Sequence, residues 1–144
     1  TAFSDVIAGC AAPRDRDQGT WITTELRAAF ERLHRWGHAH SIEVWRDDEL
    51  CGGIYGLARG SAFFGESMFS RSTDASKIAL VALCRLLAGW GFGLLDCQVA
   101  NPHLRRMGAV DISRVSFERH LQRLVDEPRE TGSWQDCAHF EDRW

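Results

Sequence analysis

Three runs rich in β-branched and aromatic residues lie between residues 41 and 69, separated only by short polar turns. The runs read SIEVW, LCGGIYGLA and AFFGESMF, and the turns between them read RDDE and RGS. Such short turns join neighbouring antiparallel strands, because a parallel strand needs a crossover of about a dozen residues or more. The sequence therefore predicts a three-stranded antiparallel meander near the middle of the chain.

Helical patterns flank this meander on both sides. Residues 24–36 place apolar side chains at helical spacing and precede Gly37, which predicts an amphipathic helix. Residues 74–88 are apolar around most of a helical circumference and end at Gly89, which predicts a buried helix with a glycine C-cap. The second helix is expected to pack on the sheet.

Shorter elements follow the buried helix. The run GLLDCQV at residues 93–99 predicts a strand, and a helical turn is expected near Pro102 before a last helix over residues 113–125. The order α, β, β, β, α, β, α predicts an α/β (α+β) fold with a mixed, mainly antiparallel sheet flanked by helices. Residues 1–144 are expected to form a single domain, and no structure is predicted for residues 126–144.

Composition excludes several classes of protein. The 17 Lys and Arg against 20 Asp and Glu give a formal charge of -3, so any contact with RNA must be local. No apolar run approaches the length of about 18 residues that a membrane span needs, and no signal peptide is indicated. Without a C-x-x-C pair, the cysteines are interpreted as reduced thiols of a cytoplasmic protein. They are Cys10, Cys51, Cys84, Cys97 and Cys137.

Polar residues in apolar surroundings are the candidates for chemistry. Strand alternation would put Asp96 and Gln98 on one face, where a buried carboxylate must be hydrogen-bonded or functional. Glu66 lies between aromatic residues in FFGESMFS. A bond to a nearby loop or helix end would also explain Asp96 and Gln98, and Glu66 could be a solvated strand-end carboxylate. Phe69 replaces the last glycine of G-x-S-x-G, which argues against a hydrolase nucleophile elbow.

Other patterns have structural explanations beside functional ones. His34, His38 and His40 could ligate a metal, but no matching Cys or carboxylate cluster accompanies them, so no metal is expected. Trp21 precedes a helix N-terminus, where an exposed indole could stack on an unpaired base. The glycines of GWGFG precede a strand, which is the wrong context for a dinucleotide site. A basic stretch could bind phosphate or be a solvated face; its members are Arg105, Arg106, Arg114, Arg119 and Arg123.

Taken together, GTWIT, GHAHSIEVW, GGIYGLARG, FFGESMFS, ASK and LLDCQVAN resemble the leucyl/phenylalanyl-tRNA–protein transferase family over residues 5–125. The resemblance implies the family's C-terminal catalytic domain with an acetyltransferase-like (GNAT) fold, and the family's upstream domain with its G-x-F-P-W motif has no counterpart here. It implies transfer of Leu, Phe or Met from aminoacyl-tRNA to proteins with N-terminal Arg or Lys, which marks them for N-end-rule degradation. The acetyl-CoA loop R/Q-x-x-G-x-G/A has no match, so no cofactor is expected.

The resemblance also implies roles for individual residues. Asp96 and Gln98 match the family's D-x-Q pair, which positions the incoming α-amine and relays its proton. Glu66 matches the residue that holds the acceptor's basic N-terminal side chain, with Ser70 beside it, and Trp21 matches the aromatic residue near the terminal adenosine of the tRNA. An apolar pocket for the donor side chain is expected from Ile54, Phe63, Met68, Leu87 and Leu95.

Two alternative functions stay open on the sequence. A ligase could use aminoacyl-tRNA with a small-molecule or peptidoglycan-precursor acceptor, although Glu66 favours a basic acceptor residue. A non-catalytic module could bind tRNA ends or degradation signals, although such a module has no need for the pair Asp96 and Gln98.

Overall fold

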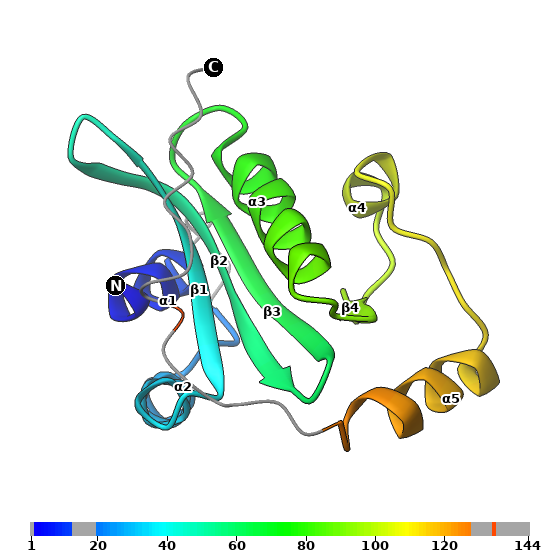
Figure 1. The fold of residues 1–144 in the computed structure, drawn as a ribbon. Coiled ribbons are helices and arrows are strands. Elements are labelled where there is room, and N and C mark those ends of the chain that lie inside the picture. Colours follow the sequence, from blue (N-terminus) through cyan, green and yellow to red (C-terminus); the bar gives the residue numbers. More distant parts are fainter. Residues whose placement is uncertain (1, 13–19, 128–133, 135–144) are drawn as a thin grey trace.

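Within residues 2–12, 20–127 and 134, which the computed structural model describes, four strands form one sheet in the order β1-β2-β3-β4. The strands are β1 (Ala39–Arg46), β2 (Glu49–Arg59), β3 (Ala62–Ser70) and β4 (Leu94–Asp96). The pairs β1–β2 and β2–β3 are antiparallel, whereas β3–β4 is parallel. The predicted meander and the mixed, mainly antiparallel sheet are confirmed (Figure 1).

Helices cover both faces of this sheet. Ile54 and Tyr55 are neighbours in β2, so their side chains point to opposite faces. Tyr55 packs with Phe3 of α1 and Phe30 of α2, and Ile54 packs with Leu83 of α3. One core cluster therefore lies under α1 and α2, and a second lies under α3 (Figure 1). The helices are α1 (Phe3–Ala11), α2 (Thr24–Arg35), α3 (Ala75–Gly89), α4 (Pro102–Arg106) and α5 (Arg114–Leu124).

The helix α1 was not predicted from the sequence. It is short, contains Gly9 and has no side-chain hydrogen bond at its N-cap, so local signals for it are weak. Its stability comes from burial of Val6 and Ile7 in the first core cluster. Gly9 permits this packing, because a Cβ there would lie 2.7 Å from the ring of Phe69.

The other helices lie where the sequence predicts them, with one correction at the end of α3. Gly89 is the last helical residue and Trp90 is the C-cap, so Gly89 does not cap the helix. The residue in the left-handed region is Gly91, with φ of 73°. None of the helices in the described part of the chain is both long and apolar enough to cross a membrane.

No disulfide joins the cysteines within the described ranges. Cys10 and Cys51 are buried, Cys97 is half-buried and Cys84 is exposed. The fifth, Cys137, lies outside the described residues.

Candidate functional site

Glu66, Asp96 and Gln98 form one hydrogen-bonded group at the end of β4. The backbone N–H of Gln98 donates to Asp96 Oδ1 at 2.8 Å. The side-chain Nε2 of Gln98 donates to Glu66 Oε1 at 3.2 Å. Three of the predicted site residues, from two separate segments, therefore meet at one place.

A β-bulge directs Glu66 toward this place. Tyr55 pairs with Ser67 and Gly56 pairs with Gly65, which leaves Glu66 as the extra residue of β3. A bulge bends its strand and changes the direction of a side chain, and bulges are frequent next to active sites. Since β4 pairs with the preceding stretch of β3, the bulge residue lies beside the end of β4.

Gly56, opposite the bulge, has no room for a side chain. A Cβ at this position would lie 2.1 Å from the carbonyl oxygen of Phe64 and 2.5 Å from the ring of Phe63. The glycine therefore permits the close approach of β2 and β3 that the bulge requires.

The predicted strand over residues 93–99 is too long. The prediction that strand alternation puts Asp96 and Gln98 on one face is also wrong. The strand ends at Asp96, and Gln98 has φ of 61°, outside the strand conformation. The two residues are joined instead by a turn in which the Asp96 carboxylate accepts from the backbone two residues later. The local hydrogen bond that the sequence left open as an alternative is thus present.

The site concentrates negative charge around an amide. Burial raises the pKa of the Glu66 carboxyl, the hydrogen bond from Gln98 lowers it, and the charge of Asp96 raises it further. Both carboxylates are half-buried, and Gln98 is exposed. Such a group can hold an alkylammonium or guanidinium ion, and a carboxylate within it can accept a proton from an amine.

A cavity of about 780 Å³ opens beside Asp96 and Gln98. Its walls come from α3, β4, the loop that follows β4, α4 and the start of α5. Apolar side chains line much of it, among them Leu80, Leu104 and Met107. The sequence did not predict this cavity. The available signal was a set of apolar residues outside the helices that stay exposed, namely Val99, Val110 and Ile112.

All five residues of the expected apolar pocket belong to the core cluster under α3. Ile54, Phe63 and Leu87 are buried there, and Met68 and Leu95 are partly buried. Leu95 also lines the cavity. The bulge contributes to this arrangement, because it shifts the alternation of β3 so that Phe63 and Met68 face the same side of the sheet.

Trp21 and Ser70 lie outside the lining of the cavity. Trp21 is in the loop before α2 with 58% of its surface exposed, next to the buried Ile22. Ser70 lies further along β3, roughly 13 Å from Glu66. Its hydroxyl donates to the carbonyl of Ser72 at 2.7 Å and accepts from the N–H of Ser76 at 3.2 Å, so it holds the start of α3.

Two of the three histidines have structural partners. His34 Nδ1 lies 2.8 Å from the carbonyl oxygen of Ala39, and its ring stacks on Phe3. His40 donates from Nε2 to the carbonyl of Gly37 at 3.0 Å and stacks on Trp134, and burial lowers its pKa to about 4. Within the described ranges, no group of three or more His, Cys, Asp or Glu residues is arranged to hold a metal ion.

Comparison with known proteins gives one consistent family. Residues 1–122 match the family described as leucyl/phenylalanyl-tRNA protein transferase. The chain is 52% identical over 144 residues to the leucyl/phenylalanyl-tRNA–protein transferase of Nitrosomonas eutropha, covering 100% of this chain and 60% of that protein. It is 54% identical over 134 residues to that of Nitrosomonas europaea, covering 93% and 57%. The chain thus spans about 60% of the length of these relatives.

Proposed function

The chain belongs to the leucyl/phenylalanyl-tRNA protein transferase family, and from this premise we propose that it carries the site of aminoacyl transfer from a charged tRNA to the α-amino group of a protein. The observation that carries the proposal is the hydrogen-bonded group of Asp96, Gln98 and Glu66 at the edge of the cavity. An amine acceptor needs such acidic, hydrogen-bonding surroundings, whereas the donor ester needs no covalent activation.

In the proposed reaction, the neutral α-amine attacks the ester carbonyl of the aminoacyl-tRNA. A C–N bond forms, the ester C–O bond breaks, and the tRNA leaves with its terminal hydroxyl restored. Asp96 takes the proton that the amine loses and returns it to the leaving oxygen of the tRNA, and Gln98 orients the amine through its side-chain amide. Positioning and proton removal supply most of the catalysis, because the ester is already activated.

The proposed acceptor is a protein that begins with Arg or Lys. The Glu66 carboxylate is half-buried and lies within hydrogen-bonding reach of Gln98, so a cationic side chain held there would place its own α-amine near Gln98 and Asp96. Ser70 is a further candidate contact for the acceptor, toward the α3 end of β3. Modification of such N-termini would mark proteins for degradation by the N-end rule in the cytoplasm.

The proposed donor is Leu-, Phe- or Met-tRNA. The proposed apolar cup for the donor side chain includes Leu95, which lines the cavity, with Ile54, Phe63, Met68 and Leu87 in the core cluster next to it. Such a cup accepts several large apolar side chains because each methylene contributes only about 1–3 kcal/mol to discrimination. Trp21 is the proposed stacking partner of the terminal adenosine, since its indole is exposed. The proposed fold family is the acetyltransferase-like (GNAT) one, supported by the antiparallel meander followed by a helix and a parallel fourth strand.

A transfer assay with matched acceptors tests this function. The chain is incubated with radiolabelled leucyl-tRNA and one protein prepared with N-terminal Arg, N-terminal Glu or an acetylated N-terminus. We expect label in the heat- and acid-stable fraction of the Arg protein alone. Equal labelling of the Arg and Glu proteins would contradict the role of Glu66, and no labelling of the Arg protein would contradict transfer by this chain.

A further inference from the structure

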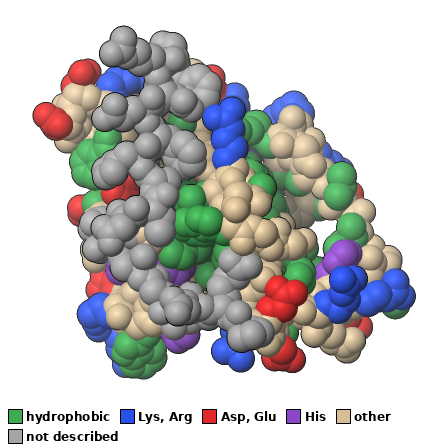
Figure 2. Space-filling view, in the orientation of Figure 1, with side chains coloured by type: hydrophobic (Ala, Val, Ile, Leu, Met, Phe, Trp, Pro, Cys, Tyr) green, Lys and Arg blue, Asp and Glu red, His purple; other side chains and the backbone are tan. Residues whose placement is uncertain are grey.

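The segment from α4 to the end of α5 is basic in a chain that is acidic overall. Residues 101–124 carry five arginines against Asp111 and Glu118, hence a net charge of +3, whereas the formal charge of the whole chain is -3. None of the residues of α4 or α5 is fully buried. Basic side chains gather over α5 on the surface in Figure 2.

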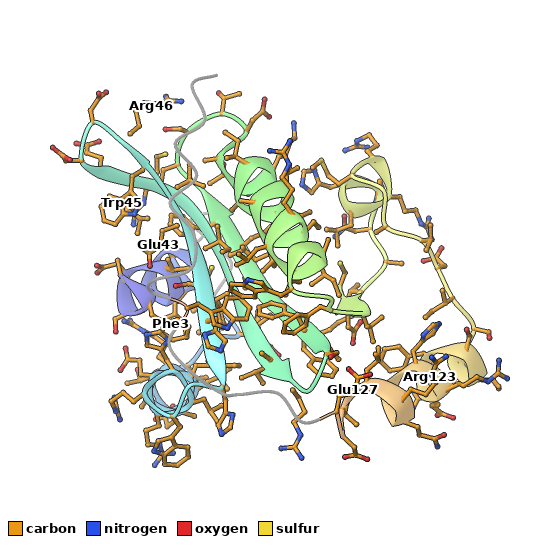
Figure 3. The ribbon with its side chains drawn as sticks, in the orientation of Figure 1. Phe3, Glu43, Trp45, Arg46, Arg123 and Glu127 are labelled. Carbon is orange, nitrogen blue, oxygen red and sulfur yellow. The ribbon has the colours of Figure 1, made fainter. Side chains whose placement is uncertain are left out.

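The charges on α4 and α5 are only partly neutralised. Arg105 pairs with Asp111 and Arg114 pairs with Glu118, each at 2.7 Å. In the part of the chain that the structure describes, Arg106, Arg119 and Arg123 form neither an ion pair nor a hydrogen bond through their side chains. Figure 3 shows Arg123 on α5. Arg119 and Arg123 are one helical turn apart, so they share a face of the helix.

The nearby Glu127 forms no ion pair with Arg119 or Arg123 in the described part of the chain. Its carboxylate accepts a hydrogen bond from the buried hydroxyl of Ser61, in the turn between β2 and β3. The backbone N–H of Ser61 also donates to the carbonyl of Leu124 at 2.8 Å. These bonds fix the end of α5 against the sheet and leave Arg119 and Arg123 on an anchored helix.

The helix α5 begins at the cavity and leads away from it. Arg114 and Phe117 of α5 line the cavity together with Asp96 and Gln98. From Arg114, the helix carries Arg119 roughly 7 Å and Arg123 roughly 13 Å further along its axis. Arg119 and Arg123 lie on the side of α5 that faces away from Arg114, so a substrate with its reactive end at Asp96 can meet them only outside the cavity.

We propose that the surface formed by Arg119 and Arg123 of α5 binds the phosphate backbone of the tRNA whose aminoacyl end lies in the cavity. This inference rests on the proposed function and names the surface that holds its donor. Charge identifies the occupant, because unpaired arginines attract phosphate and release its counterions. The proposed acceptor is cationic at its N-terminus and would be repelled by this surface.

The test is the salt dependence of tRNA binding, with a charge-matched control. Binding of deacylated leucine tRNA is measured between 50 and 200 mM salt for the parent chain, for Arg119→Gln with Arg123→Gln, and for Arg35→Gln with Arg46→Gln. The control pair removes the same charge from exposed residues at the end of α2 and at the β1–β2 turn. The affinity of a phosphate-binding surface falls as salt rises, so the slope of log affinity against log salt is negative. We expect the magnitude of this slope to fall by about 1 to 2 in the α5 variant and to stay unchanged in the control.

The same proteins are assayed for transfer from leucyl-tRNA. We expect the α5 variant to raise KM for the tRNA and to leave kcat unchanged, since its substitutions lie outside the reacting group. Equal salt slopes in the α5 variant and the parent, or no binding of tRNA by the parent, would overturn the inference. Salt-dependent binding through α5 without any transfer would support tRNA binding by this surface and contradict the proposed function. Transfer with an unchanged slope would support the proposed function and contradict tRNA binding by this surface.

Discussion

The side-chain amide of Gln98 donates to Glu66 Oε1 at 3.2 Å, across a sequence separation of 32 residues. One residue lies at a bulge in β3 and the other in the turn after β4, so the contact depends on the parallel pairing of these strands. It joins the carboxylate proposed to hold the acceptor's side chain to the amide proposed to orient its amine. Acceptor recognition and chemistry therefore share a hydrogen bond.

Removal of the charge of Glu66 should weaken acceptor binding selectively. In Glu66→Gln, we expect kcat/KM for an acceptor with N-terminal Arg to fall by about 10- to 100-fold, because a charge-assisted hydrogen bond contributes about 1.5–3 kcal/mol. The change should lie mainly in KM for the acceptor. Steady-state kinetics with varied acceptor give this split, and Glu118→Gln, which removes an exposed carboxylate on α5, is the control. A loss confined to kcat would contradict the assigned role.

The bulge should depend on Gly56. A Cβ there would lie 2.1 Å from a backbone oxygen of β3, so Gly56→Ala should lower the free energy of unfolding by about 3 kcal/mol. Gly89→Ala is the matched control, because a Cβ at Gly89 would have no neighbour within 4 Å and alanine favours the helix. Chemical denaturation measures both variants. A Gly56→Ala protein as stable as the parent would contradict the close approach of β2 and β3.

His40 should make stability depend on pH. Burial lowers its pKa in the folded protein to about 4, below the usual value of 6.5, so folding favours the neutral ring. This contribution is complete above pH 6.5 and is lost as the pH falls toward 4, because the unfolded chain then binds a proton that the folded chain does not. The loss should reach about 3 kcal/mol.

Denaturation curves between pH 4 and pH 7 test this prediction. The pH dependence should be smaller in His40→Phe, which keeps an aromatic ring against Trp134 and removes the titrating group. His120→Gln, which changes an exposed histidine on α5, should retain the dependence of the parent. Identical pH profiles for the parent and His40→Phe would show that His40 is not responsible.

The sequence predicted most of the fold because its signals are local. Alternating apolar runs with short turns define β1 to β3, and helical patterns define α2 and α5. In the structure, Thr23 and Ser113 are the N-caps of these two helices. The helix α1 escaped prediction because tertiary burial, not local sequence, stabilises it. The end of β4 was misplaced because the positive φ of Gln98 is a turn conformation that an apolar strand pattern does not reveal.

The residues of the candidate site could be predicted from the sequence, but their arrangement could not. Asp96, Gln98 and Glu66 were recognisable as polar residues in apolar runs and through the family resemblance. The bulge at Glu66 and the turn at Gln98 depend on pairing between distant strands, which no local pattern encodes. The cavity also escaped prediction, because its walls come from segments that contact one another only in the folded chain.

The single-turnover rate of Asp96→Asn tests the central claim most directly. With enzyme in excess over leucyl-tRNA and with saturating Arg-acceptor, we expect transfer by this variant to be slower by about 100-fold or more, because proton removal by a positioned base contributes 10²–10⁴-fold. Asp111→Asn, which changes another carboxylate on the cavity wall, should react at the parent rate. Equal, measurable rates for the parent and Asp96→Asn would contradict the account, because Asp96 would then not act as the base. No transfer by either protein would favour a module that binds tRNA ends or degradation signals without catalysis.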